Sequence, residues 1–260
     1  MATIGIIGYG NMGSALCRGL KRRKYAMVVT EKKEERIRAL KRHCKLKPIS
    51  VAELAQKAQI IVLAVKPQEL AGLAAELAPH AAGKRFLSVI AGKTISYFEN
   101  AFNTTQICRC MPNLAAMVGQ SAVGVSFHPQ AEETFRAECL AIIRAIGYPF
   151  PLAEGLLPAF TGLSGSGIAY VFAFLHALAL GGTAVGIRYD ESLAVATATL
   201  RGAVAALGTG KEHPVSLLSK VISPAGTTIQ GVKQLEEFGF SNAVIKAVEA
   251  AAARASEMEQ

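Results

Sequence analysis

The chain has 260 residues, enough for one large domain or two ordinary ones with a buried core. Hydrophobic residues make up 51% of it and charged residues 18%, which excludes an intrinsically disordered chain. The formal net charge of +9 is concentrated in residues 1–50, which carry 13 Lys and Arg against three Glu. Such a patch attracts anions, but no DNA- or RNA-binding motif accompanies it, so we predict no nucleic-acid partner.

The cysteines and the N-terminus indicate the cellular compartment. Cys17, Cys44, Cys108, Cys110 and Cys139 show neither paired nor metal-ligand spacing, so we predict no bound metal and no disulfide framework. This usage is typical of a reducing compartment. The sequence opens directly into an apolar strand, without the basic and long apolar regions of a signal peptide. We therefore predict a cytoplasmic protein.

Residues 1–150 alternate between apolar strands and helical segments. The expected strands are residues 3–7, 26–30, 59–65, 86–90 and 106–111. The expected helices are a segment ending at Leu20, followed by residues 34–42, 51–58, 68–80 and 94–102. This alternation predicts an α/β fold, a Rossmann-type doubly wound parallel sheet with helices on both faces.

The pattern changes near residues 147–151. Beyond this point we find no convincing strand, only helical periodicity that is broken at residues 208–210, 213–214 and 223–224. We therefore predict a dinucleotide-binding Rossmann domain over residues 1–154 and an all-α domain over residues 155–260.

A long uncharged stretch lies at the start of the helical half. No Asp, Glu, Lys or Arg occurs from Gly155 to Ile187, and residues 168–187 are long enough to span a bilayer of about 20 residues. Small residues recur there at every fourth position, at Gly165, Ala169, Ala173, Ala177 and Gly181. Such a stripe lets another helix approach closely. We therefore expect a helix buried in a subunit interface rather than a membrane span.

A glycine-rich turn joins the first strand to the first helix. The G-x-G-x-x-G pattern of Gly8, Gly10 and Gly13 stands where the dinucleotide fingerprint requires it. Gly8 permits the tight turn, Gly10 lets the backbone approach a pyrophosphate, and Gly13 lets the helix pack against the strand. The helix opening, with Asn11 and Met12, presents free N–H groups to the phosphates.

The choice between NAD and NADP depends on the end of the second strand. An acidic residue there accepts the ribose hydroxyls of NAD, whereas basic and hydroxyl groups suit the extra phosphate of NADP. The chain offers Thr30, Glu31, Lys32 and Lys33. Glu31 suits NAD, but Thr30 and the lysines favour NADP. We predict NADP, with NAD as the alternative.

Six segments spread over both halves of the chain together resemble the pyrroline-5-carboxylate reductase family. They are IGIIGYGNMG (4–13), AVKPQ (64–68), SVIAG (88–92), RCMPN (109–113), TGLSGSG (161–167) and SPAGTTIQGVKQLE (223–236). The resemblance implies NAD(P)H-dependent reduction of 1-pyrroline-5-carboxylate to L-proline, the last step of proline biosynthesis. It also implies that the helical domain is a dimerisation and substrate domain, which interleaves with a second subunit in a homodimer or larger assembly.

The last of these segments predicts a carboxylate site. Ser223 suits an N-cap and Pro224 the first helical position, so the N–H groups that follow would cradle a carboxylate. By the resemblance, Ser223, Gly226 and Thr227 hold the carboxylate of the imino acid substrate, and Thr228 faces the imine nitrogen as the catalytic residue. An ordinary capped helix is the alternative.

The resemblance also extends the cofactor site. It implies that Ala64, Val65, Lys66 and Pro67 lie along the adenosine half of the cofactor. Four further residues would line its nicotinamide end, namely Ala91, Gly92, Met111 and Asn113.

The chain departs from the family at several positions. Leu114-Ala115 replace Thr-Pro, Ile168 replaces a proline, Ala225 replaces a glycine, and His176 and Leu180 replace acidic residues. We expect His176 to be a buried, hydrogen-bonded histidine rather than a catalyst. These departures leave two alternatives open: a reductase of another cyclic imine or of a small keto or hydroxy acid, and a dinucleotide sensor without turnover.

Overall fold

The computed structural model describes residues 2–210 and 212–259. These residues form two compact units. The first unit contains the residues up to Ile168 together with those from Glu249 onward, and the second contains Ala169–Val248.

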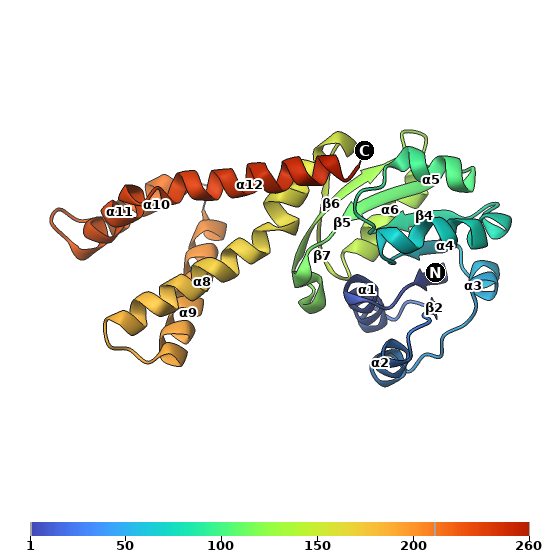
Figure 1. Ribbon diagram of the computed structural model, residues 1–260, viewed down its shortest axis with the longest axis horizontal. Coiled ribbons are helices and arrows are strands. Elements are labelled where there is room, and N and C mark those ends of the chain that lie inside the picture. Colours follow the sequence, from blue (N-terminus) through green and yellow to red (C-terminus); the bar gives the residue numbers. More distant parts are fainter. Residues whose placement is uncertain (1, 211, 260) are drawn as a thin grey trace. The chain divides into compact units, whose positions relative to one another are not determined.

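A seven-stranded sheet forms the centre of the first unit (Figure 1). The strands are β1 (Ile4–Ile7), β2 (Met27–Thr30), β3 (Ile60–Leu63), β4 (Arg85–Ser88), β5 (Ile107–Met111), β6 (Ser121–Phe127) and β7 (Gly147–Pro151). They lie in the order β2-β1-β3-β4-β5-β6-β7. All neighbouring pairs are parallel except β5 and β6. The predicted Rossmann-type sheet is therefore confirmed, with one antiparallel pair added near its edge.

Helices cover both faces of this sheet. The helices are α1 (Asn11–Arg22), α2 (Glu34–Cys44), α3 (Val51–Lys57), α4 (Leu70–Leu77), α5 (Ile95–Phe102) and α6 (Glu133–Ile143). One core cluster lies between the sheet and α1, α2 and α6, and the other between the sheet and α3, α4 and α5. Successive residues of β3 enter opposite clusters: Ile60 and Val62 enter the first, and Ile61 and Leu63 the second. A strand buried on both faces reads as a continuous apolar run, which is why this strand was predictable.

Two strands and one helix of this unit lie outside the predicted elements. They are β6, β7 and α6, and residues 147–151 were predicted to mark only a change of pattern. The strand β7 has the sequence GYPFP and pairs only with β6. Proline cannot donate to a ladder and is confined to edge positions, so Pro149 and Pro151 disguise an edge strand.

A short irregular segment follows β7. It consists of a 3₁₀ turn (Glu154–Leu156), α7 (Leu157–Phe160) and a π-helical turn (Thr161–Gly165). In the π turn the Ser166 N–H donates to the Thr161 carbonyl oxygen at 2.8 Å. This turn coincides with the TGLSGSG segment, and π turns are frequent at functional sites.

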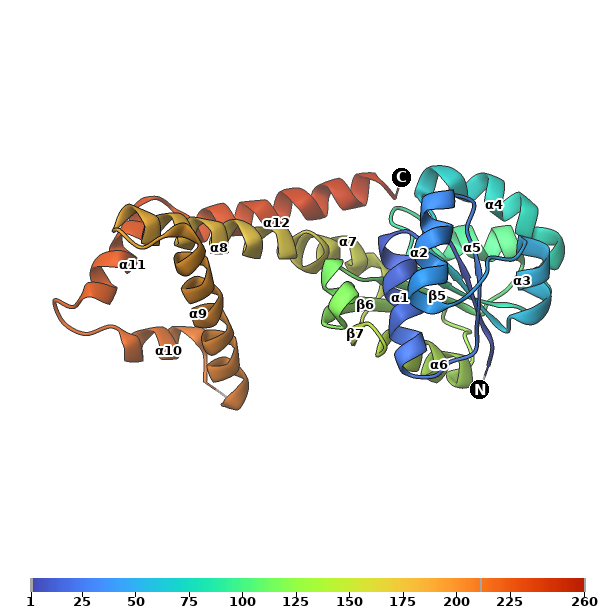
Figure 2. The same cartoon turned by 90° about the horizontal axis from the view of Figure 1, so that it is seen from below.

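The second unit is helical, as predicted. It contains most of α8 (Gly167–Ala184), all of α9 (Tyr189–Thr209), α10 (Pro214–Val221) and α11 (Thr227–Glu237), and the start of α12 (Phe240–Glu257). Figures 1 and 2 show α8 and α12 side by side. The Tyr170 hydroxyl donates to the Ala247 carbonyl oxygen at 3.1 Å, and the rings of Phe174 and Phe240 lie 5.9 Å apart.

The helices of the second unit leave much apolar surface uncovered within one chain. The side chain of Phe238 is 81% exposed and that of Val185 is 79% exposed. In the small-residue stripe Ala169, Ala173 and Ala177 are exposed, and a Cβ added at Gly181 would meet no atom within 4 Å. These four positions of the stripe are therefore open to the approach of another helix.

One stretch of the chain has the length and composition of a membrane span. Among the described residues it is Glu154–Ala184, and 11% of its most apolar window is buried within the chain.

Candidate functional site

The glycine-rich turn is held by backbone contacts that leave no room for a side chain at Gly8 or Gly13. The Gly8 N–H donates to the Thr30 carbonyl oxygen at 2.9 Å, and Gly8 has a φ of +98°. A Cβ on Gly13 would lie 1.9 Å from the Gly8 carbonyl oxygen. Gly13 therefore serves the close packing of α1 on the turn, and Gly8 the left-handed backbone.

The opening of α1 offers donors to a ligand. Its N-cap is Gly10, which has no side chain to cap the helix, and the Ser14 N–H closes the first turn onto the Gly10 carbonyl oxygen. The N–H groups of the helical residues before Ser14 have no acceptor within the helix. Together with the positive end of the helix dipole they form a site for a phosphate group.

A cavity of about 600 Å³ lies at the C-terminal ends of β1, β2 and β3. Strand order reverses between β1 and β3, which is the place where doubly wound sheets bind ligands. Nine of the predicted cofactor residues line this cavity: Gly8, Gly10, Asn11, Met12, Thr30, Lys32, Ala64, Val65 and Lys66. The cavity thus brings together the residues predicted for the diphosphate and adenosine parts of a dinucleotide.

The other predicted cofactor residues lie outside the lining of this cavity. Gly13 lies beneath the turn, and Pro67 begins a 3₁₀ turn after Lys66. Ala91 and Gly92 follow β4, and a Cβ on Gly92 would meet the Met258 carbonyl oxygen at 2.7 Å.

Met111 and Asn113 stand at the end of β5 and just beyond it. Met111 is buried. The Asn113 side chain donates to the Ser164 carbonyl oxygen at 3.2 Å and accepts from the Ala115 N–H at 3.0 Å. Asn113 therefore ties the end of β5 to the π turn of the TGLSGSG segment.

Glu31 holds two loops together. Its carboxylate accepts from the Tyr9 N–H at 2.8 Å and from the Lys32 and Lys33 N–H groups at 2.8 and 2.9 Å. The Arg36 guanidinium lies 3.7 Å away, and the Glu31 side chain is only 6% exposed. Three N–H donors of the protein thus occupy most of the acceptor positions of Glu31, which lines the cavity but is less free to bind ribose hydroxyls than the acidic residue of an NAD site.

Burial alone would raise the pKa of the Glu31 carboxyl. The three backbone N–H donors and the Arg36 guanidinium outweigh burial and hold that pKa below its ordinary value of 4.5. Because the pKa is lower in the folded than in the unfolded chain, Glu31 stabilises the fold above about pH 4.5. This contribution is lost as the pH falls below that value.

Replacing Glu31 with glutamine is expected to destabilise the protein by about 1–3 kcal/mol at pH 7, because an amide NH₂ would face the donors of Tyr9 or Lys33. The difference between Glu31→Gln and the parent should shrink as the pH falls below 4.5. Urea unfolding from pH 7 to pH 4 measures it. The matched control is Glu76→Gln, which lines the same cavity and has an exposed ion pair with Lys32. If Glu76→Gln destabilised the protein as much as Glu31→Gln, the proposed stabilising role of Glu31 would be contradicted.

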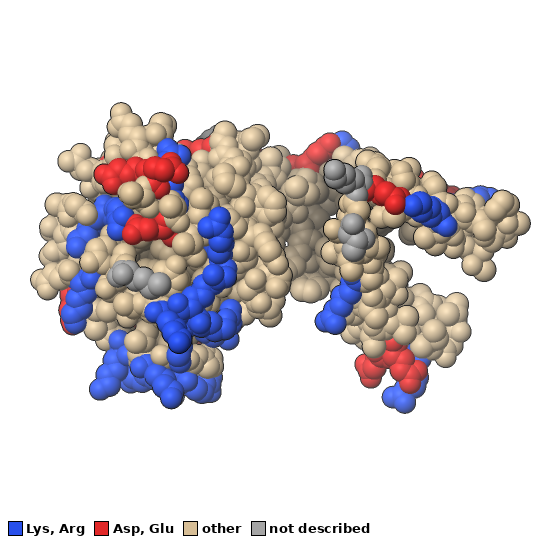
Figure 3. Space-filling view, turned by 180° about the vertical axis from the view of Figure 1, so that it is seen from behind, with Lys and Arg blue, Asp and Glu red and all other residues tan. Residues whose placement is uncertain are grey.

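Positive charge surrounds the adenosine side of the cavity. Lys32, Lys33 and Arg36 line it. Arg36 was not among the predicted site residues, although it lies in the first turn of the helix that follows the second strand, close to the lysines that were considered. Figure 3 shows further Lys and Arg side chains gathered on one face of the first unit, at the ends of α1 and α2. The exposed basic residues of these segments are Lys21, Arg22, Arg23, Lys24, Lys41, Arg42, Lys45 and Lys47.

The predicted carboxylate site differs from expectation in its cap. Ser223 and Pro224 were expected to begin the helix, but α11 begins at Thr227 and its N-cap is Gly226. The Gly226 N–H donates to the Ser223 carbonyl oxygen at 3.0 Å, and Ala225 has a φ of +58°. These are the features of a tight turn that favours glycine at its third position. Because alanine occupies this position at Ala225, the sequence did not indicate the turn.

The corrected start still gathers the predicted substrate residues. Gly226 carries no capping side chain, so the first N–H groups of α11 are available to a carboxylate. A Cβ on Gly226 would lie 2.3 Å from the Ser223 Oγ, so that hydroxyl is folded onto the helix start. Thr227 is exposed and Thr228 is half-buried.

His176 differs from its predicted environment. It is exposed within the chain, although it is hydrogen-bonded: its Nδ1 lies 2.9 Å from the Tyr189 hydroxyl. Helix α8 has uncovered faces in the second unit, and His176 lies on one of them.

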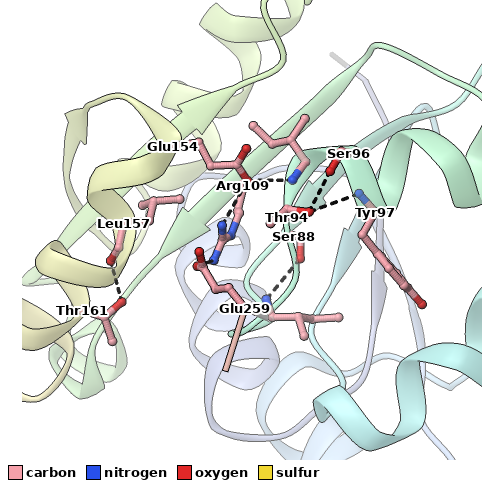
Figure 4. Close-up of polar contacts among 11 residues, drawn as sticks. Ser88, Thr94, Ser96, Tyr97, Arg109, Glu154, Leu157, Thr161 and Glu259 are labelled. Carbon is pink, nitrogen blue, oxygen red and sulfur yellow. Dashed lines mark hydrogen bonds and ion pairs between the residues drawn. The ribbon is translucent and has the colours of Figure 1, made fainter. Parts of the chain in front are cut away.

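A buried arginine links three distant segments of the first unit (Figure 4). Arg109 on β5 is 1% exposed; it pairs with Glu154 at 3.0 Å and also with Glu259. Glu154 in turn accepts from the Ile95 N–H at 2.7 Å. Arg109 belongs to the RCMPN segment, but the sequence does not indicate these partners, which lie 45 and 150 residues away.

The fold and the cavity are those of a Rossmann-type dinucleotide-binding protein with a helical C-terminal part. A family model described as NADP oxidoreductase coenzyme F420-dependent matches residues 3–92. A second model, described as pyrroline-5-carboxylate reductase dimerisation, matches residues 154–258.

Full-length relatives specify the family. The pyrroline-5-carboxylate reductase of Aquifex aeolicus is 33% identical over 98% of this chain and 97% of its own length. The crystal structure of the Coxiella burnetii pyrroline-5-carboxylate reductase is 28% identical with a TM-score of 0.91, covering 100% and 99% of the two chains. That of the Plasmodium falciparum pyrroline carboxylate reductase with NADP bound is 26% identical with a TM-score of 0.89, covering 100% and 98%. The chain belongs to the pyrroline-5-carboxylate reductase family.

Proposed function

We propose that this protein reduces 1-pyrroline-5-carboxylate to L-proline with NAD(P)H, the last step of proline biosynthesis. One observation carries the proposal: a cavity lined by fingerprint glycines and a helix start without a capping side chain occur in one chain, and 98% of that chain matches a member of this family. The enzyme is thus an oxidoreductase that acts on a carbon–nitrogen double bond.

The cavity suits a nicotinamide dinucleotide. Glycines at positions 8 and 10 keep side chains away from the phosphate site at the opening of α1. Glu31 is occupied by backbone donors, while Lys32, Lys33 and Arg36 face the same cavity. These charges favour the additional phosphate of NADP, so we propose a preference for NADP over NAD.

The proposed reaction requires little general acid or base catalysis by protein side chains. A nicotinamide dinucleotide held in the cavity would supply the hydride that reduces the imine. Ser223, Gly226 and Thr227 hold the substrate carboxylate at the start of α11 and so fix the position of the ring. Thr228 donates a hydrogen bond to the ring nitrogen, and water delivers the proton.

The assembly and the cellular location complete the proposal. The uncovered apolar faces of the second unit and the match to a dimerisation model support oligomerisation. We propose a homodimer or a larger homo-oligomer, with residues 1–154 as the dinucleotide domain and residues 155–260 as the dimerisation and substrate domain. In this assembly the helical domain of one subunit would complete the active site of its partner. The stretch Glu154–Ala184 then lies in the subunit interface of a cytoplasmic protein, with neither membrane nor nucleic acid as a partner.

Steady-state oxidation of NADPH and of NADH with 1-pyrroline-5-carboxylate tests the function and the cofactor preference together. We expect turnover with both and a higher kcat/KM with NADPH. A panel of other cyclic imines, keto acids and hydroxy acids separates the alternative reductase. NADPH binding without oxidation by any of these compounds would show a sensor and contradict the proposal.

Replacing Thr228 with alanine is expected to lower kcat/KM for 1-pyrroline-5-carboxylate at least tenfold, about 1.4 kcal/mol of transition-state stabilisation. The reason is the loss of the hydrogen bond to the ring nitrogen. The matched control is Thr134→Ala, because Thr134 is the second residue of α6 as Thr228 is of α11. Kinetics of Thr228→Ala equal to those of the control would remove Thr228 from the site.

A further inference from the structure

Two cysteines face each other between α1 and α2. Cys17 lies within α1 and Cys44 is the last residue of α2, and Figure 2 shows the two helices side by side. The Cys17 thiol donates to the Cys44 sulfur, with 2.9 Å between the two sulfur atoms. This separation is within about 1 Å of the ~2.05 Å of a disulfide bond. A small movement of either side chain would join them.

The surroundings of the two cysteines favour a negative charge on Cys44 and a protonated Cys17. The Cys17 thiol and then the Tyr9 hydroxyl donate to the Cys44 sulfur and lower the pKa of Cys44 to about 6, against the opposing effect of burial. The same hydrogen bond, with burial added, raises the pKa of Cys17. Lys21 and Arg18 place positive charge nearby. A thiolate that accepts from a neighbouring thiol is the arrangement of reactive dithiols.

We propose that Cys17 and Cys44 form an oxidation site, which hydrogen peroxide converts into a reversible disulfide between α1 and α2. The Cys44 thiolate attacks one peroxide oxygen and becomes a sulfenic acid, while the second oxygen leaves as water after taking up a proton. The Cys17 sulfur then attacks the sulfenic sulfur and releases a second water. In sum, two thiols and one peroxide yield one disulfide and two waters.

Exposure sets the order of these steps. The Cys44 side chain is 5% exposed, whereas Cys17 is fully buried. A small oxidant therefore reaches Cys44 first, and Cys17 serves as the resolving thiol.

The remaining cysteines provide an internal comparison. Burial raises the pKa of Cys108 and of Cys110 well above the ordinary value, and the contact of Cys108 with Cys139 raises that of Cys108 further. The thiols of Cys108 and Cys110 therefore stay protonated. All three of Cys108, Cys110 and Cys139 are fully buried or nearly so. Because the thiolate is the reactive form, peroxide should leave them unchanged.

Tyr9 connects the pair to the glycine-rich turn. Its buried hydroxyl lies 3.4 Å from the Cys44 sulfur, and its N–H donates to Glu31. A disulfide sulfur is a poorer acceptor than a thiolate, so oxidation leaves the Tyr9 hydroxyl without a good partner. Because Tyr9 stands between Gly8 and Gly10, we expect the turn to shift and NADPH affinity to fall at least threefold. This consequence rests on the proposed cofactor site, whereas the disulfide does not.

Peptide mapping of the full-length protein after treatment with excess hydrogen peroxide tests the disulfide. We expect a linked pair of tryptic peptides containing Cys17 and Cys44, three remaining free thiols, and reversal by dithiothreitol. Cys17→Ser should abolish the link, and the matched control Cys139→Ser should retain it. Five free thiols after treatment, or higher oxides of Cys44 without a link to Cys17, would overturn the proposal.

NADPH fluorescence titration of the reduced and the linked protein tests the coupling. The affinity of the parent should fall on oxidation and recover with dithiothreitol. Tyr9→Phe should form the same link without this redox dependence. Equal affinity of the reduced and linked parent would refute the coupling, while a failure of both forms to bind NADPH would instead refute the cofactor site.

Discussion

Replacing Gly13 with alanine should weaken NADPH binding at least 100-fold, about 2.8 kcal/mol. The added Cβ would lie 1.9 Å from the Gly8 carbonyl oxygen. Because this oxygen belongs to the backbone, a change of side-chain rotamer cannot relieve the clash. Either α1 or the turn must therefore move, and both belong to the proposed phosphate site. We also expect overpacking to destabilise the fold by about 1–3 kcal/mol. Fluorescence titration and urea unfolding measure the two effects.

Gly10→Ala separates binding from packing. A Cβ on Gly10 would meet only the Arg36 side chain, at 3.7 Å, and the backbone of Gly10 has an ordinary extended conformation. The fold should thus keep its stability, while a methyl group in the cavity should still hinder the diphosphate. If Gly13→Ala bound NADPH as tightly as the parent, or if Gly10→Ala unfolded as readily as Gly13→Ala, this account of the turn would be wrong.

Arg109→Leu is expected to destabilise the protein by about 2–4 kcal/mol. Arg109 is buried and pairs with two carboxylates, and its removal leaves both without their cation. The loss should stay below that of a fully buried pair because Glu154 is 29% exposed and Glu259 is 18% exposed, so water can reach both. The melting temperature should fall by several degrees, roughly 2–4 °C for each kcal/mol in a chain of this length.

The exposed pair of Arg254 with Glu257 is the control for Arg109. Its side chains are 72% and 60% exposed, so Arg254→Leu should change stability by less than about 1 kcal/mol. A double-mutant cycle with Glu154→Gln and Glu259→Gln would apportion the loss between the two partners. Equal effects of the two arginine substitutions would show that the buried network does not stabilise the first unit.

Periodicity and glycine spacing predicted the part of the fold that positions the cofactor. Strand β3 is buried on both faces and therefore reads as an unbroken apolar run, and the fingerprint glycines fix the turn between β1 and α1. Strand β7 escaped prediction because edge strands tolerate the prolines that exclude a central one. The start of α11 was misplaced because Ser-Pro is a common helix opening, and nothing local reveals the left-handed Ala225.

The contacts that escaped prediction join residues far apart in the chain. Glu31 was considered as a ribose ligand, yet its carboxylate accepts a hydrogen bond from the N–H of Tyr9, which lies 22 residues away. Cys17 and Cys44 meet across 27 residues. Such pairs depend on how helices pack on the sheet, and no periodicity within one element encodes them.

A crystal structure of the oligomer with NADP and L-proline bound would show whether the cofactor site and the carboxylate site meet. We expect the diphosphate to lie against the turn from Gly8 to Gly13 and the proline carboxylate to lie at the start of α11. We also expect the Thr228 hydroxyl to lie within hydrogen-bond distance of the ring nitrogen, beside a nicotinamide ring. A proline bound elsewhere, with residues 223–228 remote from every nicotinamide in the assembly, would contradict the proposed function.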